Sequence, residues 1–93
     1  MRTIERTGEF KRDYKRESKG KYRKILVEEL TKTLTLLAGD EEIPARMKDH
    51  ALVGNWSSFR DCHIKPDLVL IYKKTENNSL ILVRLGSHSE LGL

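Results

Sequence analysis

The sequence predicts an α+β fold in which an N-terminal helical hairpin packs on an antiparallel β-sheet. Apolar residues recur every three or four positions in the first half of the chain, which is the period of a helix. Beyond Pro44 the period changes to two, and short turn signals separate the alternating segments. The 93 residues are enough for one domain, 1–93, with one modest core.

The helical hairpin is predicted from two apolar stripes. Thr7 is placed to cap a first helix on which Phe10 and Tyr14 share one face, and Gly20 ends it. The second helix carries apolar residues at helical spacing: Tyr22, Leu26, Leu30, Leu34 and Leu37. Gly39 then occupies the position where a helix end favours a left-handed residue. A short edge strand at residues 2–6 precedes the hairpin.

Three strands joined by short turns are predicted for the second half. β-Branched and aromatic residues fill the segments Phe59–Ile64, Leu68–Thr75 and Leu80–Leu85. The turn residues between them are Lys65-Pro66 and Asn77-Asn78. Short connections make consecutive strands antiparallel neighbours, so the segments form a meander. The amphipathic second helix is the element long enough to cover the core face of this sheet.

The composition predicts a cytoplasmic protein without membrane contact. Hydrophobic residues make up 38% of the chain and charged residues 34%. The longest apolar run, Leu68–Tyr72, is far shorter than the roughly 20 residues that span a bilayer. The charged N-terminus lacks the apolar segment of a secretion signal. A single cysteine, Cys62, excludes an internal disulfide and suits a reducing compartment.

Positive charge is concentrated in the first quarter of the chain. The net charge is +4, but residues 1–24 hold ten Lys or Arg against four Asp or Glu, so the remainder is net acidic. The first helix contributes Lys11, Arg12, Lys15 and Arg16. Such a segment is typical of contact with a polyanion, RNA or DNA, or with an acidic protein. A solvated helix face explains the same pattern equally well.

All three histidines, His50, His63 and His88, lie at predicted strand ends or loops. Alternation in the strand from Phe59 puts His63 and Asp61 on one face and Cys62 on the other. Cys62 and His63 are therefore not expected to bind one metal ion. The chain also lacks the paired ligand spacing of zinc sites and any phosphate-binding glycine loop. We expect no metal and no other cofactor.

Two further residues complete a possible catalytic set. Arg84 and His88 have the same parity, so an extended last strand brings them to one side. Pro66 fixes a turn that brings Asp67 near His63. RNA cleavage needs a base for the 2′-hydroxyl proton, an acid for the leaving 5′-oxygen and a cation for the charged intermediate. Histidine and arginine suit these roles, although each histidine alone is explained by a strand end in solvent.

The second half of the chain resembles a known family. The segments "KDHALVGNWSSFRDCHIKPDLVLIYK" and "LILVRLGSHSELG" are similar to the YafQ-like branch of the RelE/ParE toxin superfamily, the toxins of bacterial type II toxin–antitoxin systems. The matching pattern is Lys-Asp-His, Leu-x-Gly-x-Trp, Arg-Asp-x-His-x-x-Pro-Asp and Arg-x-Gly-(Ser/Thr)-His. It runs in order from about Lys48 to Leu91, and several ordered matches are more specific than any one.

The resemblance implies a RelE-like fold and a ribosome-dependent endoribonuclease that cuts mRNA in the ribosomal A site. It also implies a cognate antitoxin that inactivates the enzyme and binds operator DNA as part of the complex. The implied catalytic residues are His50, His63, Asp67 and His88, with Arg84 on the phosphate. The basic first helix would then hold ribosomal RNA.

Two positions depart from the family pattern. Relatives often carry aromatic residues where this chain has Leu68 and Gly92, so base stacking is weaker or supplied by another side chain. Trp56 is a candidate for stacking, and equally for capping the sheet edge.

Two other functions are consistent with parts of the sequence. A ParE-like gyrase inhibitor would need no acid–base set, and a non-enzymatic RNA- or protein-binding module would need only the basic helix.

Overall fold

The computed structural model describes residues 1–93 and contains three helices, five strands and two 3₁₀ turns. In chain order the elements are β1 (Thr3–Arg6), α1 (Gly8–Glu17), α2 (Leu26–Ala38), η1 (Ala45–Met47), β2 (His50–Ala51), η2 (Gly54–Trp56), β3 (Arg60–Lys65), β4 (Leu68–Lys74), β5 (Ser79–Gly86) and α3 (His88–Leu91). Thr7 caps α1 as predicted, because its side chain accepts a hydrogen bond from the Phe10 backbone N–H.

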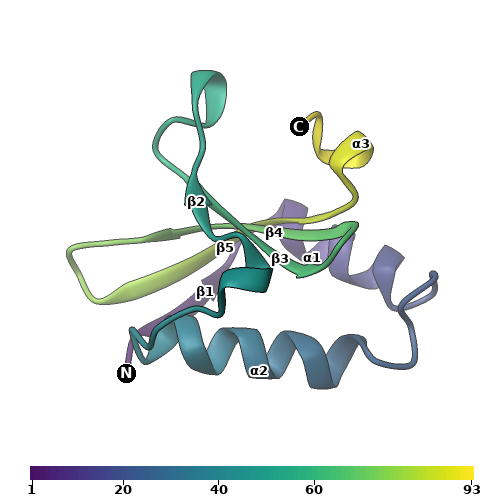
Figure 1. Cartoon of the computed structure of the whole chain (residues 1–93), viewed down its shortest axis with the longest axis horizontal. Helices are drawn as coiled ribbons and strands as arrows, with labels where there is room; N and C mark the ends of the chain where they lie inside the picture. Colours follow the sequence, from purple (N-terminus) through teal and green to yellow (C-terminus); the bar gives the residue numbers. More distant parts are fainter.

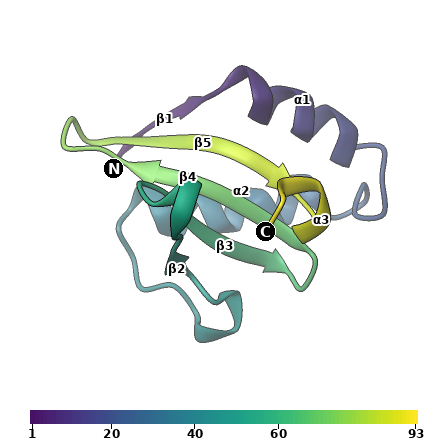
Figure 2. The same cartoon turned by 90° about the horizontal axis from the view of Figure 1, so that it is seen from above.

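The five strands form one sheet in the order β1-β5-β4-β3-β2. The strands β2 to β5 pair antiparallel, as the meander predicts. The edge strand β1 instead pairs parallel to β5, which an all-antiparallel prediction did not anticipate. Parallel pairing is possible because the helical hairpin and three strands separate β1 from β5 along the chain. Figure 2 shows β1 at one edge of the sheet and β2 at the other.

The main core lies between the helical hairpin and one face of the sheet. The helices contribute Phe10, Leu26, Leu30 and Leu37, and these pack on strand residues such as Cys62, Leu70 and Leu82. A smaller cluster covers the opposite face, where Val69, Ile71 and Val83 meet Leu91 of α3. Figure 1 shows α2 on one side of the sheet, with α3 and the segment after β2 on the other. The sheet is therefore covered on both faces.

Two local predictions were wrong, and one short strand was missed. Gly39 has φ of −87°, and the left-handed residue is Asp40, one position later, which Arg2 and Lys74 bind through its carboxylate. The chain after Gly86 was expected to stay extended, but it forms α3. A capping box causes this, because Ser87 accepts from the Glu90 N–H while the Glu90 carboxylate accepts from the Ser87 N–H. The two-residue strand β2 was also not anticipated.

No helix of the chain has both the length and the apolar character that a membrane span requires.

Candidate active site

The three histidines line one open groove of about 500 Å³ on the sheet face that the helical hairpin does not cover. They come from β2, β3 and the start of α3, which are far apart in sequence. The ring centroids of His50 and His63 are 6.4 Å apart, and those of His63 and His88 are 5.0 Å apart. The predicted convergence of the histidines is therefore present, with His63 in the middle.

His50 has two oxygen atoms near the same ring nitrogen and makes a hydrogen bond to one of them. It lies directly opposite Asp61 in the β2–β3 ladder, and its Nδ1 is 3.0 Å from Asp61 Oδ1 and 2.7 Å from the Lys48 carbonyl. Nδ1 carries the proton, because it donates to the Lys48 carbonyl, whereas Asp61 Oδ1 is close but buried without a hydrogen-bond partner; Nε2 is then the free nitrogen of the neutral ring. Nε2 of His50 can therefore take or give a proton in the groove.

Asp61 is a site residue that the sequence prediction missed as such. Its side chain is 3% exposed, and Oδ1 lies 3.0 Å from His50 Nδ1 and 3.9 Å from His63 Nε2. Burial raises the pKa of Asp61, against the opposing effect of His50 and His63. Strand alternation placed Asp61 on the same face as His63, and this could have identified Asp61 as a site residue from the sequence.

His63 is the most enclosed of the three rings, with 14% of its side chain exposed. Burial lowers the pKa of His63, and the positive charges of His88, His50 and Lys48 add to this effect while Asp61 opposes it. A neutral imidazole is therefore favoured at this position. Its neighbour Cys62 points into the core as predicted, where burial raises the pKa of the thiol to about 12.

His88 has its own carboxylate partner. Its Nδ1 lies 3.1 Å from Asp67 Oδ1, and its backbone N–H donates to the same oxygen at 3.3 Å. These hydrogen bonds lower the pKa of Asp67, so the carboxylate is ionised at neutral pH. Asp67 was expected near His63, but the turn at Pro66 brings it to His88 instead. The α3 capping box makes this possible, since it places the His88 N–H at the first turn of a helix.

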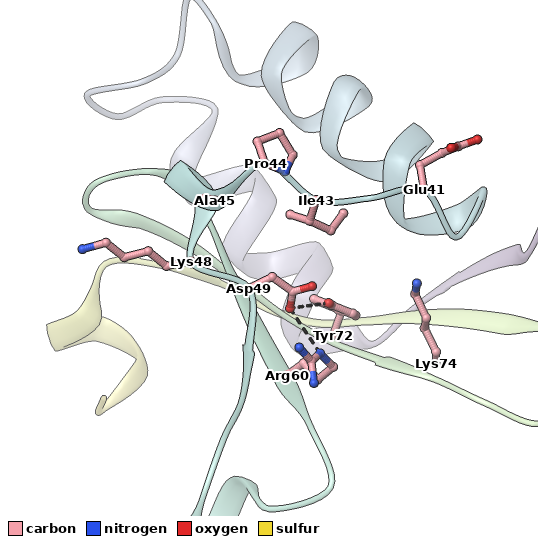
Figure 3. Close-up of a pocket in the computed structure, with 9 residues that line it drawn as sticks. All are labelled: Glu41, Ile43, Pro44, Ala45, Lys48, Asp49, Arg60, Tyr72 and Lys74. Carbon is pink, nitrogen blue, oxygen red and sulfur yellow. Dashed lines mark hydrogen bonds and ion pairs between the residues drawn. The ribbon is translucent and has the colours of Figure 1, made fainter.

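A buried network fixes the segment that carries His50. Figure 3 shows Asp49 pointing toward Tyr72 and Arg60. The Tyr72 hydroxyl donates to Asp49 Oδ1 at 2.6 Å, and Arg60 Nε donates to the same oxygen at 3.2 Å. Tyr72 is 1% exposed, and its burial raises the pKa of the phenol. This network joins the backbone beside His50 to the core.

Arg84 is held by a carboxylate on α1. Its Nε donates to Asp13 Oδ2 at 2.6 Å and its Nη2 to Oδ1 at 3.3 Å, while the Leu85 N–H donates to Oδ2. The expected alignment of Arg84 with His88 on an extended strand is absent, because β5 ends at Gly86 and His88 begins α3. Burial alone would raise the pKa of Asp13, but its hydrogen bonds from Arg84 and the Leu85 N–H lower it overall.

Of the other predicted contact residues, Trp56 lines the histidine groove and the four basic residues of α1 do not. Lys11, Arg12 and Lys15 are exposed on α1, whereas Arg16 pairs with Asp13, Glu17 and Glu90. Trp56 lines the histidine groove and stacks edge-on against Phe59, with ring centroids 5.6 Å apart.

Of the two departures from the family pattern, Leu68 is fully buried in the main core, and Gly92 takes the left-handed position that ends α3. No group of three or more His, Cys, Asp or Glu side chains is arranged to hold a metal ion.

Comparison with known proteins defines the class first. Residues 2–92 match a family described as a bacterial toxin of type II toxin–antitoxin systems. Within that class, the chain belongs to the YafQ family.

Individual relatives agree with this assignment over nearly the whole chain. The mRNA interferase toxin YafQ of Escherichia coli K12 is 38% identical over 92 residues, which cover 98% of this chain and 96% of the relative. A metal-bound toxin from Helicobacter pylori superimposes with a TM-score of 0.82 at 40% identity, covering 98% of this chain and 99% of that one. YafQ in the E. coli DinJ–YafQ complex gives 0.79 at 35% identity, covering 98% of both chains.

These comparisons confirm the α+β fold and the predicted class of enzyme, an endoribonuclease toxin of the mRNA interferase type.

Proposed function

We propose that this toxin cleaves mRNA in the ribosomal A site by acid–base catalysis, with His50 and His88 as the two proton-transfer groups. One observation supports this pairing above the others. Each of the two rings has a carboxylate at Nδ1, Asp61 for His50 and Asp67 for His88, so both present Nε2 as the free nitrogen. His63 separates them and has no carboxylate at hydrogen-bond distance.

The reaction then proceeds through the side chains of the groove. One imidazole takes the proton of the 2′-hydroxyl, and the oxygen attacks the adjacent phosphorus. The other histidine, in its protonated imidazolium form, donates its Nε2 proton to the 5′-oxygen as the phosphorus–oxygen bond breaks, which yields a 2′,3′-cyclic phosphate and a free 5′-hydroxyl. A histidine side chain thus accepts or donates each of the two protons that are transferred, and no nucleophilic side chain is required.

Arg84 is the proposed source of positive charge for the phosphate. Its Nε and Nη2 bind Asp13, but Nη1 makes no hydrogen bond within the chain. A guanidinium can bind a carboxylate on one edge and a phosphate oxygen with a remaining N–H group. Asp13 thus fixes the direction of Arg84, which is not among the residues that line the histidine groove, so the proposed phosphate contact is made from outside that groove.

The exposed cations of α1 are proposed to hold the ribosomal RNA backbone. Lys11, Arg12 and Lys15 make no ion pair within the chain, so they are available to phosphate groups. Arg16 joins the end of α1 to α3 through Glu90 at 3.1 Å, and this contact connects the ribosome-binding helix to the element that carries His88.

The partner of the toxin is proposed to be a cognate antitoxin, as the complex of E. coli YafQ with DinJ suggests. Because the surface to be covered is cationic, the antitoxin should be acidic or carry an acidic segment that folds on binding. The complex is proposed to bind its operator DNA mainly through the antitoxin, and the toxin to act in the cytoplasm, where translating ribosomes are found.

The acid and base can be separated with a modified mRNA whose scissile 5′-oxygen is replaced by sulfur. A thiolate leaves without protonation, because thiols are far more acidic than alcohols. Of the variants His50→Gln and His88→Gln, the one lacking the acid should regain its cleavage rate on this substrate, and the one lacking the base should not. Full activity of both variants on ordinary mRNA would refute the proposed pair.

A further inference from the structure

A second groove adjoins the histidine groove and shares His63 and His88 with it, but its basic residues have no role in the chemistry described above. It encloses about 450 Å³, and only one of its lining residues is apolar. The residues are Arg46, Lys48, His63, Ile64, Lys65, Pro66 and His88. We refer to this surface as the lateral groove. Since His63 and His88 belong to both grooves, one strand of RNA can pass from the first into the second.

The lateral groove is cationic and is not neutralised from within the chain. No carboxylate lines it, and neither Arg46 nor Lys48 takes part in any ion pair. Lys65 has one distant partner, Glu29, at 3.7 Å. Three cations lining one groove repel each other, and this arrangement is stabilised when an anion binds between them.

The backbone of Lys48 adds a second, independent observation. Lys48 has φ of 49° and ψ of 41°, a left-handed conformation that costs energy for a residue with a side chain. This conformation ends η1 and places the Lys48 carbonyl 2.7 Å from His50 Nδ1. Figure 3 shows that the Lys48 side chain leaves the backbone away from the direction of Asp49. Lys48 thereby lines both the lateral groove and the histidine groove.

We infer that the lateral groove binds a backbone phosphate of the mRNA next to the scissile phosphate, through Arg46, Lys48 and Lys65. This inference rests on the proposed function, since it assumes that the RNA is cut between the histidines. It adds a binding subsite formed by η1 and the turn after β3, on elements separate from the basic helix α1. The occupant is single-stranded RNA recognised by its phosphates, without regard to base sequence.

The test measures binding of the complete chain to a short, fluorescent single-stranded 2′-O-methyl RNA, which cannot be cleaved. The triple variant Arg46→Gln/Lys48→Gln/Lys65→Gln should bind about tenfold more weakly at low salt. The dependence of log K on log salt should flatten by roughly 0.7 for each phosphate contact removed. Lys32→Gln is the matched control, because it removes one exposed cation of α2 and should change neither quantity.

Two further measurements separate the possible RNA sources and the two proposals. Binding of the triple variant to ribosomes without mRNA should equal that of the original chain, and a loss there would assign the groove to ribosomal RNA and overturn the inference. Unchanged affinity for the oligonucleotide would overturn it as well. If the original chain fails to cleave mRNA, the proposed function is refuted, and the oligonucleotide result still decides whether the groove binds phosphates. Circular dichroism verifies that each variant is folded.

Discussion

Tyr72 and Asp49 form a 2.6 Å hydrogen bond that connects the main core to the residue preceding His50. Tyr72 belongs to the core cluster under the helices, while Asp49 begins the exposed edge of the sheet. The strand β2 has only two residues and therefore few ladder bonds of its own. This hydrogen bond, together with Arg60, supplies much of the constraint on the position of His50.

Replacement of Tyr72 by phenylalanine should test that constraint. The ring still fills the core, but a partly buried carboxylate loses a donor, which should cost about 1–2 kcal/mol of unfolding free energy. The turnover rate should fall as His50 becomes less well placed, with little change in KM. Urea unfolding and cleavage kinetics measure the two effects. Tyr14→Phe is the control, because the Tyr14 hydroxyl makes no hydrogen bond and its loss should leave both quantities unchanged. An equal loss in both variants would contradict the structural account.

Asp61→Asn should make the protein more stable and less active. Burial raises the pKa of Asp61, so keeping this carboxylate ionised at neutral pH lowers the stability of the folded chain. Cleavage should fall roughly 10- to 100-fold, because one orienting carboxylate is lost while the Lys48 carbonyl still holds Nδ1 of His50. Thermal unfolding and single-turnover cleavage give the two measurements.

The effect of Asp61→Asn on the free energy of unfolding should depend on pH. A carboxyl group whose pKa is raised on folding lowers the free energy of unfolding at any pH above its unfolded pKa of 3.8. This destabilisation disappears as the pH falls below 3.8, because the group is then protonated in both states. The stability gained by Asp61→Asn should therefore be present at pH 7 and absent near pH 3. A loss of stability at pH 7 would show that the carboxylate contributes to folding.

Asp13→Asn should have the opposite effect on stability. The pKa of Asp13 is lowered in the folded chain, so its contribution is present above 3.8 and is lost as pH falls through the folded pKa. Because Asp13 is buried and holds Arg84, its neutralisation should cost about 3 kcal/mol at pH 7. Urea unfolding at pH 7 and pH 3 measures this difference, and a cost that persists in full at pH 3 would exclude the ionic explanation.

Trp56→Ala should weaken substrate binding without changing the chemical step. Stacking of a base on an aromatic ring contributes roughly 1–3 kcal/mol, so KM should rise about tenfold or more while the turnover rate is retained. Trp56→Phe should keep most of the affinity, since it preserves a ring against Phe59. Cleavage kinetics on ribosomes compare the two variants. A fall in turnover with unchanged KM would assign Trp56 to packing of the site.

The sequence predicted the parts of the fold that depend on periodicity. The stripe of α2 and the three strands β3, β4 and β5 were all placed to within a few residues, because apolar spacing determines which face of each element is buried. The alternation at Cys62 and His63 was correct for the same reason. The strand β2 was missed because two residues carry no period.

The partners of the site residues were harder to predict, because they depend on tertiary register. Nothing local to Arg84 indicates that Asp13, 71 positions earlier, binds it. The pairing of Asp67 with His88 depends on α3. The Ser87-x-x-Glu90 capping box that begins this helix is visible in the sequence, but it was not used in the prediction. The proposed catalytic set was predicted from residue type and resemblance, whereas the carboxylates beside His50 and His88 required the structure.

The strand β3 directs alternate side chains to opposite faces, Cys62 and Ile64 to the core and Asp61 and His63 to the groove that we propose is the active site. Single substitutions can therefore abolish cleavage and leave the shape of the toxin intact. Such a variant would still be recognised by the antitoxin and would compete with active toxin for it. Deletion of one residue from the strand has a different outcome, because every later side chain changes face and the core and the groove are lost together.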